Sequence, residues 1–138
     1  MRYLLDTNVV SALRIRGRNP EVERWAERSA IFDLYVSAMT VAEIERGVIA
    51  KERSDPEQGA VLRRWLEEWV LPAFDGRVLG FGLPEARVIA AYRVPEHAPL
   101  DDAIIAATAQ IADLVVATRN AKHFEPFGVR VVNPWAVS

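Results

Sequence analysis

The chain has 138 residues, of which 51% are hydrophobic and 26% are charged, a balance typical of one globular domain, residues 1–138, with a sizeable core. No apolar run approaches the roughly 18 residues that a membrane span needs, and the N-terminus meets an acid too early for a signal peptide, so we expect a cytoplasmic protein. With no Cys and two His, the chain lacks the residues for disulfides, thiolate zinc sites or multi-histidine sites. The net charge of −2 gives no broad attraction for nucleic acid. Chemistry must therefore come from carboxylates, hydroxyls or a bound metal ion.

The chain begins with a predicted strand that leads into a helix. Residues 3–5 form a short apolar strand, and Asp6 or Thr7 is suited to cap a helix through residues 9–13. After a basic turn, Pro20 fits the first position of a second helix, because a backbone N–H at that position would have no helical partner. The apolar face of this second helix contains Val22, Trp25 and Ala26.

The middle of the chain predicts a second strand and two further helices. Residues 34–36 are the strand, and Ser37 or Thr40 can cap a helix that runs to about Arg53. A turn at residues 54–56 separates this helix from a long amphipathic one. The apolar face of the long helix contains Leu62, Trp65, Leu66 and Trp69.

The last part of the chain again alternates strands with helices. Residues 77–79 predict a brief strand and residues 83–93 a helix, and the helix at 100–112 is apolar on nearly all sides, so we expect it to be buried. Residues 114–117 and 129–132 are β-branched runs typical of parallel strands covered on both faces. The sequence therefore predicts an α/β fold with a central, mostly parallel sheet, in which ligands gather at the carboxyl ends of the strands.

Two groups of acids stand where such a fold would place a ligand. Asp6 directly follows the first strand, where it can cap a helix or act as a metal ligand or base. Asp101 and Asp102 open the buried helix, and their side chains point about 100° apart. One of the two can therefore cap the helix or face water while the other reaches a site. Taken singly, each acid is explained well by capping.

Another acid, Glu43, lies within the helix predicted after residue 37. On a helical wheel Glu45 falls inside the apolar stripe and Glu43 lies roughly opposite to it, which favours a solvent-facing Glu43 paired with Arg46. The interpretation changes if these separate acids meet, because several carboxylates within a few ångströms need a cation. Oxygen ligands without Cys or clustered His suit Mg²⁺, with Mn²⁺ as a substitute.

Polar residues also follow the strand predicted at 114–117. Residues 118–120, Thr-Arg-Asn, can supply hydroxyl, guanidinium and amide groups to an anion, or form an ordinary turn and cap. His123 is more typical of a surface residue than of a ligand. The glycine-containing stretch at 80–85 lacks the last glycine of a dinucleotide site and the βαβ unit around it, so it does not favour a nucleotide cofactor.

Four segments resemble the PIN-domain family in order and spacing: Leu4 to Val9, Thr40 to Gly47, Pro99 to Ala109 and Thr118 to Phe124. Within this family the chain resembles VapC-type, FitB-like toxins of type II toxin–antitoxin systems. The resemblance implies a PIN-like three-layer α/β/α fold. It also implies a Mg²⁺-dependent endoribonuclease that hydrolyses RNA phosphodiester bonds.

The resemblance further implies roles for individual residues. The implied metal ligands and catalytic acids are Asp6, Glu43 and Asp102, with Glu43 acting as a ligand or as a water-positioning base. Asp101 would be a cap or an auxiliary acid. Many PIN domains carry a fourth acid where this chain has Asn120 or His123, so Asn120 would orient a ligand water and the number of metal ions, one or two, stays open. Residues placed to contact substrate are Thr7, Asn8, Arg14, Arg16, Arg18 and Thr118, although the basic turn is equally explained by solvation.

The resemblance implies an RNA substrate, a VapB-like antitoxin whose C-terminal segment lies across the site, and a homodimer, without membrane association. Three tryptophans are either candidate contacts with these proteins or ordinary core residues: Trp25, Trp65 and Trp69. Two alternatives stay open: a PIN-fold RNA-processing nuclease that is not a toxin, and a non-catalytic α/β module that binds a partner or RNA. A phosphatase built on Asp6 is disfavoured, because Asn8 stands where a second Asp would be needed.

Overall fold

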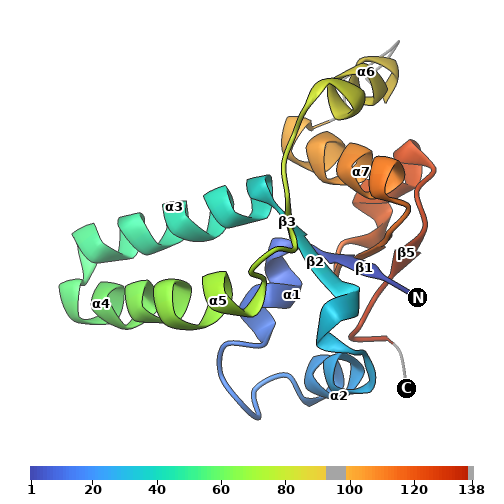
Figure 1. The fold of residues 1–138 in the computed structure, drawn as a ribbon. Coiled ribbons are helices and arrows are strands. Elements are labelled where there is room, and N and C mark those ends of the chain that lie inside the picture. Colours follow the sequence, from blue (N-terminus) through green and yellow to red (C-terminus); the bar gives the residue numbers. More distant parts are fainter. Residues whose placement is uncertain (93–98, 137–138) are drawn as a thin grey trace.

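The computed structural model describes residues 1–92 and 99–136 and confirms the α/β fold (Figure 1). Within these residues the sheet has five strands in the order β3-β2-β1-β4-β5, and each neighbouring pair is parallel. The strands are β1 (Tyr3–Leu5), β2 (Leu34–Ser37), β3 (Val78–Leu79), β4 (Val115–Ala117) and β5 (Val131–Val132). All the predicted strands are therefore confirmed, with shifts of one or two residues at their ends.

Helices cover both faces of this sheet. Those before β3 are α1 (Thr7–Ala12), α2 (Pro20–Arg28), α3 (Ala38–Ser54), α4 (Pro56–Trp65) and α5 (Leu71–Ala73). Those after β3 are α6 (Leu83–Tyr92), α7 (Leu100–Ala112) and a 3-10 segment at Ala121–Phe127. The helix predicted to reach Arg93 is described to Tyr92, and Arg93 lies outside the described residues. Among the helices described, none has the length and apolar character to cross a membrane.

Side chains that alternate along β1 divide the interior into two cores. Leu5 packs on one face of the sheet with residues of α1, α2 and α3, among them Val9, Val22 and Val48. Leu4 points to the opposite face and packs with Ile105 of α7 and with Phe124. All of these side chains are buried. The three-layer α/β/α arrangement is therefore confirmed, with the most apolar helix, α7, buried as expected.

Helices α3 and α4 lie side by side and extend away from the sheet as a helical hairpin (Figure 1). Ser37 caps α3 and Asp55 caps α4, and the side-chain oxygen of each accepts a backbone N–H of the first turn. Arg63 on α4 lies 3.0 Å from a carboxylate oxygen of Glu45 and 3.0 Å from one of Glu52, both on α3. Glu45 therefore faces the neighbouring helix, which explains why an acid falls within the apolar stripe of α3.

The long helix predicted after residue 56 is interrupted. Helix α4 ends at Trp65, a π-helical turn follows at Leu66–Val70, and α5 adds one further turn. Pro72 accounts for this break, because it has no N–H to donate and its ring clashes with a regular α-helical carbonyl four residues earlier. The π turn keeps Leu66 and Val70 in the core but leaves Trp69 exposed.

Candidate active site

Asp6 lies where β1 ends and α1 begins, at the carboxyl edge of the sheet. It is the N-cap of α1, and its Oδ1 accepts the backbone N–H of Thr7 at 2.8 Å. Its Oδ2 accepts the hydroxyl of Thr118 at 2.8 Å and the amide of Asn8 at 3.3 Å. The capping role is confirmed. The same buried carboxylate is also held in one orientation at the edge where ligands of parallel sheets bind.

The loop after β4 lies against Asp6 and is tied to α1. The backbone N–H of Asn120 donates to the Thr118 hydroxyl oxygen at 3.0 Å, and the N–H of Arg119 donates to Oδ1 of Asn8 at 3.1 Å. The structure thus brings together Asp6, Asn8 and Thr118, while Asn120 itself is exposed on the loop. Because Thr118 and Asp6 are 112 positions apart, only the parallel pairing of β1 with β4 makes them neighbours.

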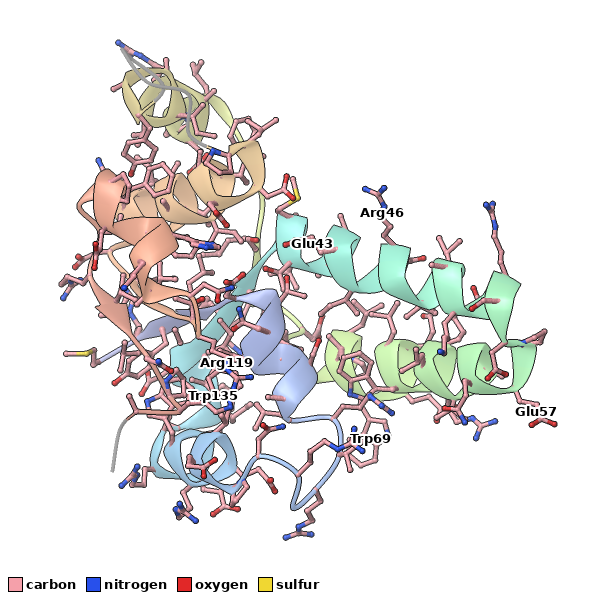
Figure 2. The ribbon with its side chains drawn as sticks, turned by 180° about the vertical axis from the view of Figure 1, so that it is seen from behind. Glu43, Arg46, Glu57, Trp69, Arg119 and Trp135 are labelled. Atoms are coloured by element: carbon pink, nitrogen blue, oxygen red, sulfur yellow. The ribbon has the colours of Figure 1, made fainter. Side chains whose placement is uncertain are left out.

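Glu43 lies near the start of α3, close to the sheet (Figure 2). Its Oε1 accepts the hydroxyl of Thr7 at 2.9 Å, so it is partly buried beside α1. The predicted pairing of a solvent-facing Glu43 with Arg46 is wrong, since Glu43 is partly buried and bonded to Thr7, while Arg46 projects from the outer side of α3, away from α4 (Figure 2). The wheel missed this because it considers α3 alone, whereas α1 and α7 both pack against α3.

Asp102 lies in the first turn of α7 with its side chain 22% exposed. Its Oδ2 is 3.7 Å from Nδ1 of His123, a surface residue as expected, so the imidazole forms an ion pair when it is protonated. Asp101 is exposed, and the N-cap of α7 is Pro99, without a side-chain hydrogen bond. As predicted, one acid, Asp101, faces water and the other, Asp102, faces the site. The predicted capping role is wrong for both, because Pro99 is the N-cap of α7.

The acids of the site repel one another. Burial raises the pKa of Glu43 above its ordinary value of 4.5, and Asp6, Asp101 and Asp102 raise it further against the opposing hydrogen bond from Thr7. Burial likewise raises the pKa of Asp102 above 3.8, with a further increase from Asp6 and a partial offset from His123. Carboxylates that disfavour each other's ionisation in this way are stabilised by a nearby cation.

The donor chemistry of the site fits a hard divalent cation. Its side chains offer carboxylate, hydroxyl and amide oxygens, the ligands that Mg²⁺ and Mn²⁺ prefer. The acids do not form a finished coordination sphere, since across residues 1–92 and 99–136 no three acidic or imidazole groups are gathered closely enough to hold a metal ion. The fit to a metal ion therefore rests on ligand type and on the mutual repulsion of the acids.

The raised pKa values predict a pH-dependent stability for the metal-free chain. Folded Glu43 and Asp102 bind protons more tightly than the unfolded chain does, so their contribution to stability falls as the pH rises above 4.5 and 3.8, respectively. In EDTA, the melting temperature of the unaltered chain should fall between mildly acid and neutral pH. In Glu43→Gln this fall should be smaller, because Gln carries no titrating group. Glu57→Gln, at the exposed tip of the α3–α4 hairpin (Figure 2), is the control. Identical pH profiles for the two variants by circular dichroism would contradict this coupling.

Two hollows lie on either side of Arg14, and one of them includes a residue of the acid site. A cavity of about 210 Å³ is lined by Thr7, Glu43, Arg14 and Trp65, among others, so Arg14 and Glu43 share this cavity. Arg16 instead lines a larger groove of about 610 Å³, together with Arg14 and residues of α2 and α4. Arg18 is exposed and lines neither hollow.

The tryptophans have different surroundings. Trp25 is buried in the core, Trp65 is partly buried, and Trp69 is 70% exposed at the rim of the larger groove. Of the three, Trp69 is thus the one available to a partner. Trp135 was not singled out from the sequence, yet the guanidinium of Arg119 lies over its ring beside the site. No sequence motif marks this pair, because only the fold brings the chain end to the loop after β4.

Comparison with known proteins agrees with this architecture. The sequence profile described as the PIN domain matches residues 3–126, from β1 into the segment after β4. The chain belongs to the PIN-domain family. The predicted family resemblance is therefore confirmed over most of the chain.

The individual relatives include a toxin and a VapC ribonuclease. The chain is 38% identical over 137 residues to Toxin FitB of Neisseria gonorrhoeae, covering 96% of this chain and 97% of FitB. It is 58% identical over 74 residues to Ribonuclease VapC14 of Mycobacterium tuberculosis, covering 54% of this chain and 72% of that protein. The crystal structure of FitAcB from Neisseria gonorrhoeae has a TM-score of 0.89 and 37% identity, covering 98% of this chain and 99% of that chain. The similarity to VapC-type and FitB-like proteins is confirmed.

Proposed function

We propose that the chain is a Mg²⁺-dependent endoribonuclease that hydrolyses RNA phosphodiester bonds and acts as the toxin of a VapBC-type toxin–antitoxin system. The observation that carries the proposal is the hydrogen bond from Thr7, next to Asp6, to Glu43, together with the electrostatic repulsion among Asp6, Glu43 and Asp102. The names Ribonuclease VapC14 and Toxin FitB, which two relatives bear, support it. We further propose that residues 1–138 act as one PIN domain in the cytoplasm.

Asp6 and Asp102 would hold the metal ion, with Glu43 as a further ligand or as the base that positions water. When bound, Mg²⁺ supplies Lewis-acid chemistry and neutralises the charge that builds on the phosphoryl oxygens. Thr118 and Asn8 orient Asp6 by donating to its Oδ2. Thr7 holds Oε1 of Glu43, which leaves Oε2 to accept a proton from the attacking water. Burial and the neighbouring acids raise the pKa of Glu43 toward neutral pH, and a general base is most effective when its pKa lies near the working pH.

Contacts with RNA would be local, because a net charge of −2 gives no broad attraction for nucleic acid. Arg14 shares a cavity with Thr7 and Glu43 and is therefore placed to contact a phosphate next to the site. Asn120 is exposed at the same edge of the sheet and would contact the substrate there, whereas the Thr118 hydroxyl is buried and instead orients Asp6. Arg16 lies farther along the surface, in the larger groove, where it would contact a more distant phosphate.

Glu43→Gln tests the nuclease directly. Gln keeps an acceptor for the Thr7 hydroxyl but removes the charge and the base, so we expect Mg²⁺-dependent cleavage of a labelled single-stranded RNA to slow by about a hundredfold. Glu57→Gln removes an equivalent charge at the far end of the hairpin (Figure 2) and should cleave RNA at the unaltered rate. If both folded variants cleave RNA equally well, or if the unaltered chain cleaves none, the nuclease proposal fails.

The toxin role depends on a partner, for which we propose a VapB-like antitoxin, and on a homodimer of this chain. Induced expression should arrest growth, and co-expression of a small antitoxin-like neighbouring gene should restore it. Trp69, with most of its ring exposed at the larger groove, is the first residue to replace in mapping that contact. An active nuclease that leaves growth unchanged would instead indicate an RNA-processing enzyme.

A further inference from the structure

Arg119 and Trp135 form a stacked pair beside the candidate active site. The Cζ atom of Arg119 lies 4.8 Å from the centroid of the Trp135 ring, within the range of a cation–π contact. Figure 2 shows the two labels next to each other, below Glu43. Arg119 directly follows Thr118, whose hydroxyl donates to Asp6, and its own N–H donates to Asn8. The pair is thus connected to the acid site by short hydrogen bonds.

Trp135 provides a fixed surface for this arginine. Its ring packs against the core formed by β1, α1 and α2, and its indole N–H donates to Oδ1 of Asn19 at 3.3 Å. Its backbone N–H donates to Oδ1 of Asn133 at 3.0 Å. Asn19 closes the turn that carries Arg14, Arg16 and Arg18. Trp135 therefore holds together the loop after β4 and the basic turn between α1 and α2.

Among residues 1–92 and 99–136, no carboxylate pairs with the guanidinium of Arg119. Arg63 and Arg130 each form ion pairs with carboxylates. Arg119 is exposed, and in the described part of the chain its guanidinium has the Trp135 ring as a neighbour but no hydrogen bond or ion pair. The planar set of N–H donors thus remains available to a bidentate oxygen acceptor such as a phosphate.

We propose that Arg119 binds a backbone phosphate of the RNA strand next to the bond that is cleaved, and that Trp135 is the positioning residue that holds its guanidinium. This inference rests on the proposed ribonuclease function. An arginine already fixed on an aromatic ring loses less side-chain freedom on binding than a free one. In a weakly acidic chain, such a prearranged contact supplies affinity that the overall charge does not.

The binding test uses the full chain and a fluorescein-labelled single-stranded RNA oligonucleotide in EDTA, which stops Mg²⁺-dependent cleavage. Fluorescence anisotropy over a range of KCl concentrations should show that Arg119→Ala weakens binding about tenfold. It should also lower the slope of log affinity against log salt by about one. Arg119→Lys should keep the slope but bind about threefold more weakly than the unaltered chain, because it lacks the planar fork. Arg46→Ala, on the outer side of α3 (Figure 2), removes an equal charge and should change neither quantity.

Trp135 variants separate positioning from charge. Trp135→Ala should weaken RNA binding while keeping the salt slope, because Arg119 remains charged but is no longer held. Trp135→Phe keeps a ring for the guanidinium and should restore most of the affinity. Thermal denaturation identifies any variant that fails to fold. Equal weakening by Trp135→Ala and Trp135→Phe, with both folded, would overturn the positioning role.

Cleavage kinetics distinguish this inference from the function on which it rests. Arg119→Ala should raise KM with little change in kcat, as expected for a contact made equally in ground and transition states. Unchanged affinity, salt slope and KM in Arg119→Ala would overturn the inference and leave the nuclease standing, as expected if the pair binds an acidic peptide instead. RNA binding that depends on Arg119 without any cleavage would overturn the nuclease alone. Failure of the unaltered chain to bind RNA would overturn the inference.

Discussion

The Asp6→Asn chain is expected to cleave RNA about a thousandfold more slowly than the unaltered chain. Asp6 is the buried acid of the site, and three donors, from Thr7, Asn8 and Thr118, hold both of its oxygens. Asn is as good an N-cap as Asp, so α1 should still form. The substitution removes the negative charge and places a donating NH₂ group where Asp6 accepts hydrogen bonds from Thr7, Asn8 and Thr118. Single-turnover cleavage of a labelled RNA in Mg²⁺ measures the loss.

Two further measurements make this result specific. Calorimetric titration with Mg²⁺ should show weaker binding by Asp6→Asn than by Glu57→Gln, whose charge is removed far from the site. Thr118→Val removes the hydroxyl that donates to Oδ2 of Asp6 but leaves the acid in place, so its loss should be smaller, about tenfold. Undiminished cleavage by a folded Asp6→Asn chain would exclude Asp6 from the reaction.

The second large effect is on stability, where Gly59→Ala should lower the free energy of unfolding by about 3 kcal/mol. Gly59 is buried where α4 crosses α3, and an added Cβ would lie 2.4 Å from Cα and 2.6 Å from the backbone N of Glu52. Backbone atoms cannot rotate away as a side chain can, so the two helices would have to separate. That movement would also strain the contact between Arg63 and Glu52. Urea denaturation followed by circular dichroism measures the change.

Gly47→Ala is the matched control for this prediction. Gly47 lies within α3, and an added Cβ there would meet nothing within 4 Å. Ala is the better helix former, so this variant should gain about 0.5–1 kcal/mol. A lower free energy of unfolding in Gly59→Ala and a higher one in Gly47→Ala would support the close packing of α3 against α4. A gain in both would show that α3 and α4 do not approach each other at Gly59.

Much of the fold could be predicted because its signals are local. The β-branched runs at 114–117 and 129–132 mark buried parallel strands, and both became neighbours in the sheet. Asp6, Ser37 and Pro20 mark helix starts, which the structure confirms. The interrupted helix after residue 65 was missed, because the apolar repeat continues through the π turn while Pro72 breaks the regular hydrogen bonding.

Local sequence patterns predict the candidate site less well than they predict the fold. Asp6 can be placed from the end of β1, but a helical wheel favours Glu43 as a surface acid, and the family resemblance is what indicates a role for it. A helical wheel reports which side of one helix faces the core, and it holds no information about a second helix beside its first turn. The hydroxyl of Thr7, on α1, decides the environment of Glu43 from 36 positions away.

The sequence by itself therefore determined the α/β class and the order of the elements, because periodicity and caps depend on residues close together in the chain. Four motifs in order indicated the family, and a composition without Cys and with two His left oxygen groups as the candidate metal ligands. Only the tertiary structure decided which polar groups meet. The bonds from Thr118 to Asp6 and from Trp135 to Asn19 span 112 and 116 positions. Such contacts arise from the parallel pairing of β1 with β4 and from the packing of the chain end against the core, which no short segment encodes.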